Sequence, residues 1–493
     1  MSNNNPKEGI FKNKIVLVAM ALDATTFESL SPSRFVSFTL PNPTCSHSLL
    51  RVAVLDSPLQ STHPPHVAAM LVPQGRETDW IFSTKFGHLQ LLFTSPGISR
   101  LILIGNQLNE SDFDSSPYIY HRPLKCSLHH QGFEVWSKPL LLALSPKSLF
   151  KNCIPEIPIM SYEDNLVSSV VIHQCASSHV GEMLVEDVEI ETQSDMHHGC
   201  LRMEFRRRLR FKRMPNLIQT EVLIAPEIDP GSNTVRIGEA KFVPDLRVLV
   251  HPYLAPMVAS LSLISEYIEQ QIQNGFRPKA LCLGVGGGAL LTFLAIQLGF
   301  EVIGVDSDRE VLKVAKNYFG LEDSEFIHVI VGDAIKYMKK LAYHRTLHSK
   351  SSSVDHCEHD GFDHLVNGEV TAHKFDVVMV DLDSTDVRNG ISSPPLEFVR
   401  KRVVLAAKLV LSEFGILAIN IISPSQSFYD KLVNHFQKVF HELYKIDVGN
   451  GENCILIASI SPQVFSDRDC SNSFLLRLKS VIPETYINSI RKI

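Results

Sequence analysis

The chain has 493 residues, is 44% hydrophobic and 20% charged, and carries a formal net charge of −6 at pH 7. This length allows two or three domains. The composition is that of a globular protein, with no apolar run near the roughly 18 residues of a membrane helix. The absence of such a run means that no membrane association is expected, and the negative charge argues against nonspecific nucleic-acid binding, so that direct DNA binding is not expected either. The nine cysteines are scattered without a CxxC pair, which fits a reducing compartment and favours a cytoplasmic location.

Residues 1–245 predict a β-rich N-terminal region. Short apolar runs such as Leu50–Leu55 and Arg100–Ile104 are separated by Pro, Ser and Asn, a pattern typical of strands. Near the start, Ile15–Leu22 follows two lysines and resembles a short secretory signal. Because this run is short and is closed by Asp23, a first β-strand is favoured over a signal.

Within this region, residues 202–224 predict a β-hairpin. Apolar side chains alternate with basic ones along Arg202–Arg213, and a second strand-like run, Leu217–Ile224, follows after a short turn. A period of two places one face against a core and a basic stripe on the other face. The stripe consists of Arg206, Arg208, Arg210 and Lys212. We interpret it as a solvated strand face, with contact to an acidic partner or RNA as the alternative.

Residues 246–493 predict an α/β domain. Helical periodicity alternates with apolar strand-like runs from Ala280–Gly284 onward, and this alternation indicates a parallel, doubly wound sheet. The last two runs, Leu443–Val448 and Cys454–Ser459, are separated by a short Gly-rich turn and predict a C-terminal β-hairpin. A seven-stranded, mostly parallel sheet with such a hairpin is typical of the Rossmann-like class I methyltransferase fold.

A polar segment, residues 343–374, interrupts this pattern and is predicted to be a surface insertion. It contains His356-Cys357-Glu358-His359, but adjacent ligands without a second spaced pair make a poor tetrahedral site. No metal site is therefore expected.

The first strand of the α/β domain ends in a glycine-rich turn. A helical pattern follows, and the second strand ends in Asp306. Glycine permits a tight turn and close approach of the backbone to a ligand, and an acidic residue about 20 positions further on can accept hydrogen bonds from ribose hydroxyls. The residues predicted to bind a nucleotide-type cofactor here are Gly284, Gly286, Gly287, Gly288 and Asp306.

Two later strands also end in acidic residues. Asp333 and Ala334 follow the third strand, where an S-adenosylmethionine site places groups that meet the adenine. The fourth strand delivers Asp381 and Asp383 to the same carboxyl edge of the sheet. The alternative is that these aspartates only cap the helices that follow. Their recurrence at three strand ends favours S-adenosylmethionine as cofactor, with Asp381 near both the cofactor and the acceptor.

This half of the chain resembles the spermidine-synthase-like class of methyltransferase folds, on Gly332-Asp333-Ala334, on the fourth-strand sequence FDVVMVDLDS and on Phe414-Gly415-Ile416-Leu417. Two further stretches are similar to the methyltransferase-like protein 13 family. One runs from Asp381-Leu382-Asp383-Ser384 through Gly390–Pro395 to Phe398-Val399, and the other is VPQGRETDW at residues 72–80. The resemblance covers about residue 50 to the end.

The resemblance implies a function. Members of that family are dual methyltransferases of translation elongation factor 1-alpha, with a separate N-terminal domain that methylates a lysine. This chain has one glycine-rich cofactor turn and nothing comparable in residues 1–245. The resemblance therefore implies methylation of the factor's N-terminal α-amine, with Asp381 and Asp383 as catalytic residues and the factor as protein partner. A truncated form that lacks the lysine methyltransferase domain is also compatible with the sequence, and the oligomeric state stays open.

The α-amine is a chemically reasonable acceptor. Its unperturbed pKa is about 7.7–8.0, against about 10.4 for lysine, so it loses its proton at a cost about 3.4 kcal/mol lower. No strong base is then required. Asp381 or Asp383 would hold the ammonium group, accept or relay its proton, and orient the nitrogen lone pair.

Two other functions stay open. Aminopropyltransferases (polyamine synthases) resemble Leu217-Ile218-Gln219-Thr220, but their glycine turn usually continues with Asp-Gly-Gly, whereas this chain has Ala289-Leu290-Leu291. A catalytically inactive methyltransferase-fold scaffold is the second alternative, against which the intact glycine turn and acidic strand ends argue. A nicotinamide dehydrogenase is least favoured, because no second dinucleotide-binding half follows residue 330.

Overall fold

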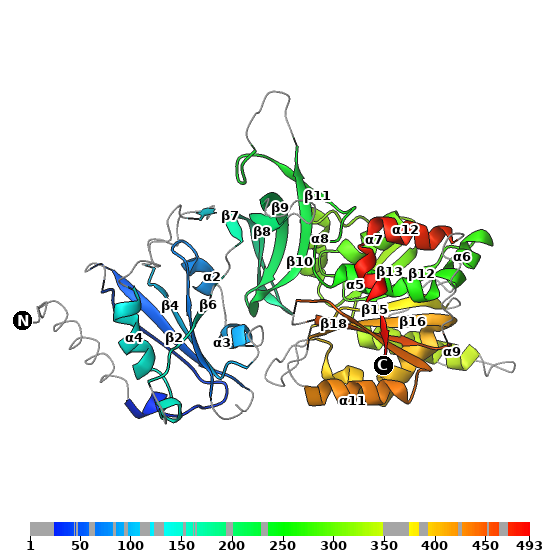
Figure 1. Cartoon of the computed structure of the whole chain (residues 1–493). Helices are drawn as coiled ribbons and strands as arrows, with labels where there is room; N and C mark the ends of the chain where they lie inside the picture. Colours follow the sequence, from blue (N-terminus) through cyan, green and yellow to red (C-terminus); the bar gives the residue numbers. More distant parts are fainter. Residues whose placement is uncertain are drawn as a thin grey trace, which may run out of the picture.

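The computed structural model describes residues 24–43, 45, 48–58, 65–81, 85–92, 97–108, 119–122, 133–150, 154–160, 162, 165–193, 201–227, 235–348, 374–383, 393–422, 426–450, 453–462 and 472–493. The described strands form three β-sheets, and Figure 1 shows them side by side, from the N-terminal sheet to the C-terminal one. The strand predicted at Ile15–Leu22 lies outside the described residues.

The first sheet has five strands in the order β1-β2-β4-β3-β6 and is buried on both faces. Helix α4 packs on one face through Leu140 and Leu141, and Trp80 with Leu89 covers the other face. The predicted β-rich region therefore begins with a layered α/β unit. Its strands are β1 (Phe35–Pro41), β2 (Leu49–Asp56), β3 (Val67–Leu71), β4 (Arg100–Asn106) and β6 (Ile159–Met160). Its helices are η1 (Ala24–Phe27), α2 (Glu77–Ile81), α3 (Lys85–Leu89), η2 (Gln90–Leu92), α4 (Phe133–Ala143) and η4 (Lys147–Phe150).

The second sheet is antiparallel and has six strands in the order β11-β10-β9-β8-β7-β5. Its strands are β5 (Ile119–His121), β7 (Leu166–Ser177), β8 (Gly181–Gln193), β9 (Leu201–Phe211), β10 (Met214–Pro226) and β11 (Phe242–Asp245). Strands β9 and β10 form a hairpin over the predicted residues, with Arg208 opposite Glu221.

The prediction of a solvated basic stripe on this hairpin is wrong. Arg208 and Arg210 are buried, and each forms ion pairs inside the protein. Arg208 Nε lies 2.7 Å from Oε1 of Glu221, while Arg210 Nε lies 2.9 Å from Oε1 of Glu186. Acidic residues on the neighbouring strands thus neutralise the stripe, and the N-terminal unit covers it. The pattern of one strand cannot reveal either feature.

The VPQGRETDW stretch attaches the N-terminal unit to the antiparallel sheet. Asp79 Oδ1 accepts a hydrogen bond of 2.8 Å from Arg210 and also pairs with Arg76. Glu77 accepts hydrogen bonds from the Gly75 backbone N–H and from Asn106, at 2.6 and 2.8 Å. The motif therefore joins a turn of the first unit to a strand of the second sheet.

The third sheet has eight strands in the order β14-β13-β12-β15-β16-β18-β17-β19, one more than predicted. Strands β12 to β16 are parallel, and β18 runs antiparallel to both β16 and β17. The additional strand β19 has two residues at the sheet edge, too few to produce an apolar pattern. The strands are β12 (Lys279–Leu283), β13 (Glu301–Asp306), β14 (Ile327–Val331), β15 (Phe375–Val380), β16 (Leu411–Ile422), β17 (Glu442–Asp447), β18 (Asn453–Ser459) and β19 (Arg491–Lys492).

Helices cover both faces of this sheet (Figure 1). One layer contains α5 (Leu254–Ala259), η5 (Ser260–Ile264), α6 (Ser265–Gln273), α7 (Ala289–Leu298), α8 (Arg309–Tyr318), α12 (Ser473–Val481) and α13 (Glu484–Asn488). The other contains α9 (Ala334–His348), η7 (Leu396–Val399), α10 (Lys401–Val410) and α11 (Gln426–Gln437). The predicted start of the polar insertion at residue 343 is wrong, because α9 continues to His348. The rest of the insertion, including His356–His359, lies outside the described residues. None of the described helices is long and apolar enough to cross a membrane.

Candidate functional site

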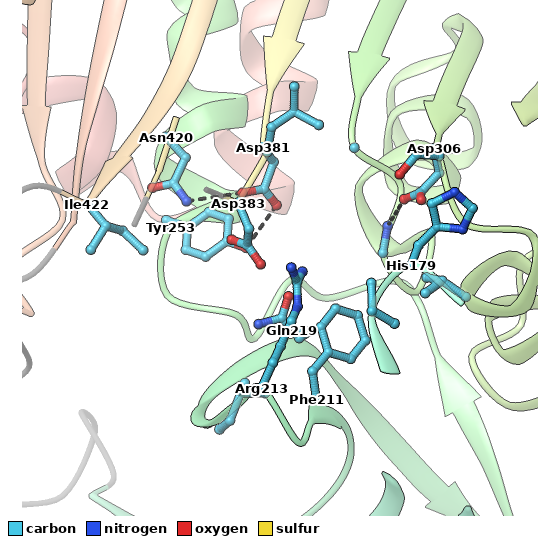
Figure 2. Close-up of a pocket in the computed structure, with 17 residues that line it drawn as sticks. His179, Phe211, Arg213, Gln219, Tyr253, Asp306, Asp381, Asp383, Asn420 and Ile422 are labelled. Atoms are coloured by element: carbon cyan, nitrogen blue, oxygen red, sulfur yellow. Dashed lines mark hydrogen bonds between the residues drawn. The ribbon is translucent and has the colours of Figure 1, made fainter. Parts of the chain in front are cut away.

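A cavity of about 240 Å³ lies at the carboxyl ends of the parallel strands β12, β13, β15 and β16 (Figure 2). The turns β9–β10 and β7–β8 of the antiparallel sheet close it from the opposite side. Its described lining residues are His179, Val180, Phe211, Arg213, Ile218, Gln219, Tyr253, Gly284, Gly286, Asp306, Ser307, Val311, Asp381, Leu382, Asp383, Asn420 and Ile422.

The glycine turn forms one wall through Gly284 and Gly286, two of the residues predicted to bind the cofactor. At Gly284, φ is +92°, and a Cβ there would lie 2.0 Å from the backbone oxygen of Asp381. No larger residue fits at this position, because both the backbone conformation and the neighbouring strand exclude a side chain. Gly287 and Gly288 do not line the cavity. The Gly287 N–H donates a hydrogen bond of 2.7 Å to Thr220 Oγ1, and Gly288 precedes helix α7.

Asp306 is bound to this turn through its side chain. Oδ2 accepts hydrogen bonds from the backbone N–H groups of Val285 and Gly286, at 3.1 and 3.3 Å, and Oδ1 accepts one from Asp308. Burial raises the pKa of Asp306, although these hydrogen bonds oppose the rise. The cap of helix α8 is Asp308, not Asp306. Each carboxylate oxygen of Asp306 therefore keeps acceptor capacity toward the cavity.

Asp333 and Ala334 are placed differently from the other predicted residues. Asp333 Oδ1 accepts a hydrogen bond of 2.8 Å from the Lys336 N–H in the first turn of α9, and its side chain is 50% exposed. Neither residue is among the described residues that line the cavity. At Asp333 the helix-capping alternative is realised, and contact of this pair with an adenine stays a prediction.

Asp381 is held on both of its oxygens. The Tyr253 hydroxyl donates to Oδ2 at 2.8 Å and Asn420 Nδ2 donates to Oδ1 at 3.1 Å. Asn420 is in turn fixed by Asn453, whose Nδ2 lies 2.8 Å from its Oδ1. Burial raises the pKa of Asp381, and the hydrogen bonds from Asn420 and Tyr253 oppose this rise. The carboxylate is thus fixed in orientation by neutral donors.

Asp383 is half-buried and lies beside Asp381. Burial raises the pKa of Asp383 to about 7, and the positive charge of Arg213 limits the rise. Figure 2 shows Arg213 extending from the β9–β10 turn toward this carboxyl group. A carboxyl group with a pKa of about 7 can accept and release a proton near neutral pH, which is the property required of a general base.

No family model matches this chain. It is 26% identical over 437 residues to the eEF1A lysine and N-terminal methyltransferase of Xenopus laevis, covering 86% of this chain and 55% of that relative. The human protein of the same name is 24% identical over 428 residues, covering 83% of this chain and 53% of the relative.

The chain resembles the eEF1A lysine and N-terminal methyltransferases. The resemblance predicted from the sequence motifs is thereby confirmed over most of the chain, which spans about half the length of these curated relatives.

Among solved structures, human methyltransferase-like protein 13 in complex with SAH matches with a TM-score of 0.35 and 23% identity. The match covers 49% of this chain and 94% of that one. A spermidine synthase in complex with the transition-state analogue AdoDATO matches with a TM-score of 0.35 and 12% identity, covering 65% of this chain and 90% of that one.

Several lining residues were not predicted as site residues. They are His179, Phe211, Arg213, Gln219, Tyr253 and Asn420. One sequence motif could have indicated Gln219, because Leu217-Ile218-Gln219-Thr220 resembles a stretch that precedes the catalytic domain of aminopropyltransferases. The strand alternation of the hairpin carries no sign that its turn folds over the edge of another sheet.

Proposed function

We propose that this chain is an S-adenosylmethionine-dependent protein N-methyltransferase that methylates the N-terminal α-amine of translation elongation factor 1-alpha. The observation that carries the proposal is that Asp381 and Asp383 open into the same cavity as the glycine turn and Asp306. A cofactor-type wall and a pair of potential acceptor-binding carboxylates are thereby brought together. The names of the relatives support the reaction and the substrate.

The residues present fit the cofactor. The backbone at Gly284 forms a cradle that a Cβ would fill, and Asp306 keeps acceptor capacity suited to ribose hydroxyls. In this proposal Gly284, Gly286 and Asp306 hold the cofactor directly. Gly287 and Gly288 shape the turn, and Asp333 and Ala334 would contact the adenine. When bound, S-adenosylmethionine supplies an electrophilic methyl group on a sulfonium.

The two carboxylates have different roles in the proposed reaction. Asp381, held by Tyr253 and Asn420, provides a fixed negative charge that binds and orients the substrate ammonium. Asp383 accepts the proton that this ammonium must lose before its lone pair can react. Phe211, Ile218 and Ile422 contribute apolar lining, which limits access of water to the reacting amine.

Proton transfer to Asp383 is easier from an α-ammonium than from a lysine ammonium. An α-ammonium has a pKa of about 7.7–8.0, so transfer of its proton to a group with a pKa of about 7 costs about 1 kcal/mol. For lysine, with a pKa of about 10.4, the same transfer costs about 5 kcal/mol. This difference supports the N-terminal amine as acceptor.

Intact-mass analysis of elongation factor 1-alpha incubated with this protein and S-adenosylmethionine tests the proposal. Factor with a free N-terminus and factor with an acetylated N-terminus are compared in parallel. The proposal expects mass increases in steps of one methyl group only on the free N-terminus. No increase, despite measurable cofactor binding, would refute it.

Two further assays test the alternative functions. Incubation with putrescine and decarboxylated S-adenosylmethionine tests whether the protein is an aminopropyltransferase. The scaffold reading predicts that S-adenosylhomocysteine does not bind, which calorimetric titration measures.

A further inference from the structure

Arg213 reaches the site from a different sheet than the catalytic carboxylates. It occupies the β9–β10 turn of the antiparallel sheet, whereas Asp381 and Asp383 follow β15 of the C-terminal sheet. Its guanidinium carbon lies 5.3 Å from the centroid of the Phe211 ring. Its Nε is buried and has no hydrogen-bond partner among the described residues. Arg213 is therefore an ordered donor with unused hydrogen-bonding capacity at the cavity.

Arg213 and Asp383 line the same cavity, but among the described residues neither a hydrogen bond nor an ion pair within 4 Å joins them. Their charges nevertheless interact, since Arg213 lowers the pKa of Asp383. Of the described lining residues, Arg213 is the one lysine or arginine. The cavity thus presents a carboxylate and a guanidinium to whatever molecule lies between them.

A ligand that satisfies both groups needs a cationic amine close to a hydrogen-bond acceptor. An N-terminal residue has this arrangement, because its α-amine and its carbonyl carbon are attached to the same Cα. A polyamine has no acceptor, and its second ammonium would be repelled by Arg213. In a lysine side chain, four methylene groups separate the amine from the backbone.

We propose that Arg213 is a specificity-determining residue that donates to the first carbonyl oxygen of the substrate, while Asp383 receives the α-amine. This inference rests on the proposed function and deepens it, because it explains selection of a peptide N-terminus. Gln219 is a less suitable donor, since its side chain already hydrogen-bonds Asp383. The fork of a guanidinium suits a carbonyl oxygen, which can accept two N–H donors.

The N-terminal half of the chain positions this arginine. Beside it, Lys212 Nζ lies 2.6 Å from Glu182 Oε1, which connects the β9–β10 turn to strand β8. Arg210, three residues before Arg213, is fixed by Asp79 and Glu186. Residues 1–245 would therefore contribute to substrate selection through a rigid strand and its turn.

The test combines a protein variant with a substrate analogue. Wild-type protein and Arg213→Met are each assayed on two substrates. One is the natural N-terminal peptide of elongation factor 1-alpha, and the other is the same peptide with its first peptide bond replaced by an alkene. The alkene keeps the planar shape and removes the carbonyl oxygen. Replacing the carbonyl also raises the pKa of the amine, so kcat/KM is expressed per deprotonated amine for each peptide. On that scale we expect kcat/KM to fall roughly 10- to 100-fold for either change alone, the effect of losing one charge-assisted hydrogen bond. Combining both changes is expected to add little further loss.

Controls separate a folding defect from a lost contact. Lys241→Met changes a cation whose side chain is 77% exposed and which is not among the described residues that line the cavity, and it is expected to keep wild-type selectivity between the two peptides. Arg213→Lys keeps the positive charge but lacks the paired N–H donors of the guanidinium, so the loss of kcat/KM is expected to lie between those of wild type and Arg213→Met. Binding of S-adenosylhomocysteine, measured for every variant, reports whether the site is folded.

The outcomes are distinguishable. Multiplicative losses in the combined experiment would show that Arg213 and the carbonyl act independently and would overturn the inference while the proposed function stands. Failure of the wild-type protein to methylate the natural peptide, with S-adenosylhomocysteine bound normally, would overturn the proposed function and this inference with it.

Discussion

Replacement of Asp383 by asparagine is expected to stabilise the folded protein while it removes most of the activity. The side chain is half-buried, and burial raises its pKa to about 7 from an ordinary value of 3.8. The difference corresponds to about 4 kcal/mol at most, the cost of keeping this carboxylate ionised in the folded protein. Asparagine has nearly the same shape and cannot ionise, so the variant avoids this cost.

The sign of the pH dependence follows from the raised pKa. The folded state binds the Asp383 proton more tightly than the unfolded chain, so the wild-type protein gains stability from this group below about pH 4. That contribution is lost as the pH rises toward 7 and is absent above it. The stability of Asp383→Asn relative to wild type should therefore increase between about pH 4 and 7 and then level off.

Urea denaturation of both proteins at several pH values between 5 and 8.5, without ligand, measures this difference. The transition to follow is the one that S-adenosylhomocysteine shifts in the wild-type protein, because it reports on the domain that contains the site. Asp323→Asn is a suitable control: this side chain is 60% exposed, and its replacement should change the free energy of unfolding by less than about 1 kcal/mol. Methyl transfer by Asp383→Asn should fall at least about 100-fold. A stability difference that does not change with pH, or undiminished methyl transfer, would refute the reasoning.

Three further changes have defined outcomes. Gly284→Ala should abolish S-adenosylhomocysteine binding in calorimetry, because its Cβ would lie 2.0 Å from the Asp381 backbone oxygen; wild-type affinity would contradict the placement of the cofactor turn. Tyr253→Phe removes one of the two donors to Asp381, so kcat should fall roughly tenfold while the affinity for S-adenosylhomocysteine stays unchanged. If kcat and this affinity fell by the same factor, Tyr253 would be assigned to cofactor binding instead. Burial alone would raise the pKa of Asp79, but the charges of Arg210 and Arg76 lower it well below its ordinary range. Asp79→Asn should therefore lower the free energy of unfolding by about 3–5 kcal/mol near neutral pH. The difference should shrink at low pH, where the wild-type carboxylate is protonated. An unchanged urea midpoint at pH 7 would show that this ion pair does not stabilise the protein.

The strand ends of the C-terminal sheet that line the cavity could be read from the sequence because they are local features. Gly284, Asp306 and Asp381 each follow an apolar run, and parallel strands bring their carboxyl ends to one edge of the sheet. Two of the predicted glycines, Gly287 and Gly288, shape the turn without lining the cavity. The sequence pattern predicts glycines in the turn but not which of them line the cavity. That depends on the packing of Thr220 against Gly287 and of Leu321 against Gly288.

The part of the cavity that the antiparallel sheet contributes could not be read from the sequence, because it comes from segments distant in the chain. Arg213 and Gln219 belong to a strand pair whose alternation predicts a hairpin but not what the hairpin covers. The same pattern led to a wrong prediction for the basic stripe, whose partners Glu186, Glu221 and Asp79 lie on other elements.

By itself, the sequence determined the α/β character of the C-terminal domain and the order of its strand ends, because side-chain periodicity and glycine conformation are properties of a few consecutive residues. Only the tertiary structure decided that the hairpin turn closes the cavity, that Asp333 caps a helix and that Asp383 has a pKa of about 7. Burial and the charge of a residue from another sheet set that pKa. Both arise when segments far apart in the chain pack together.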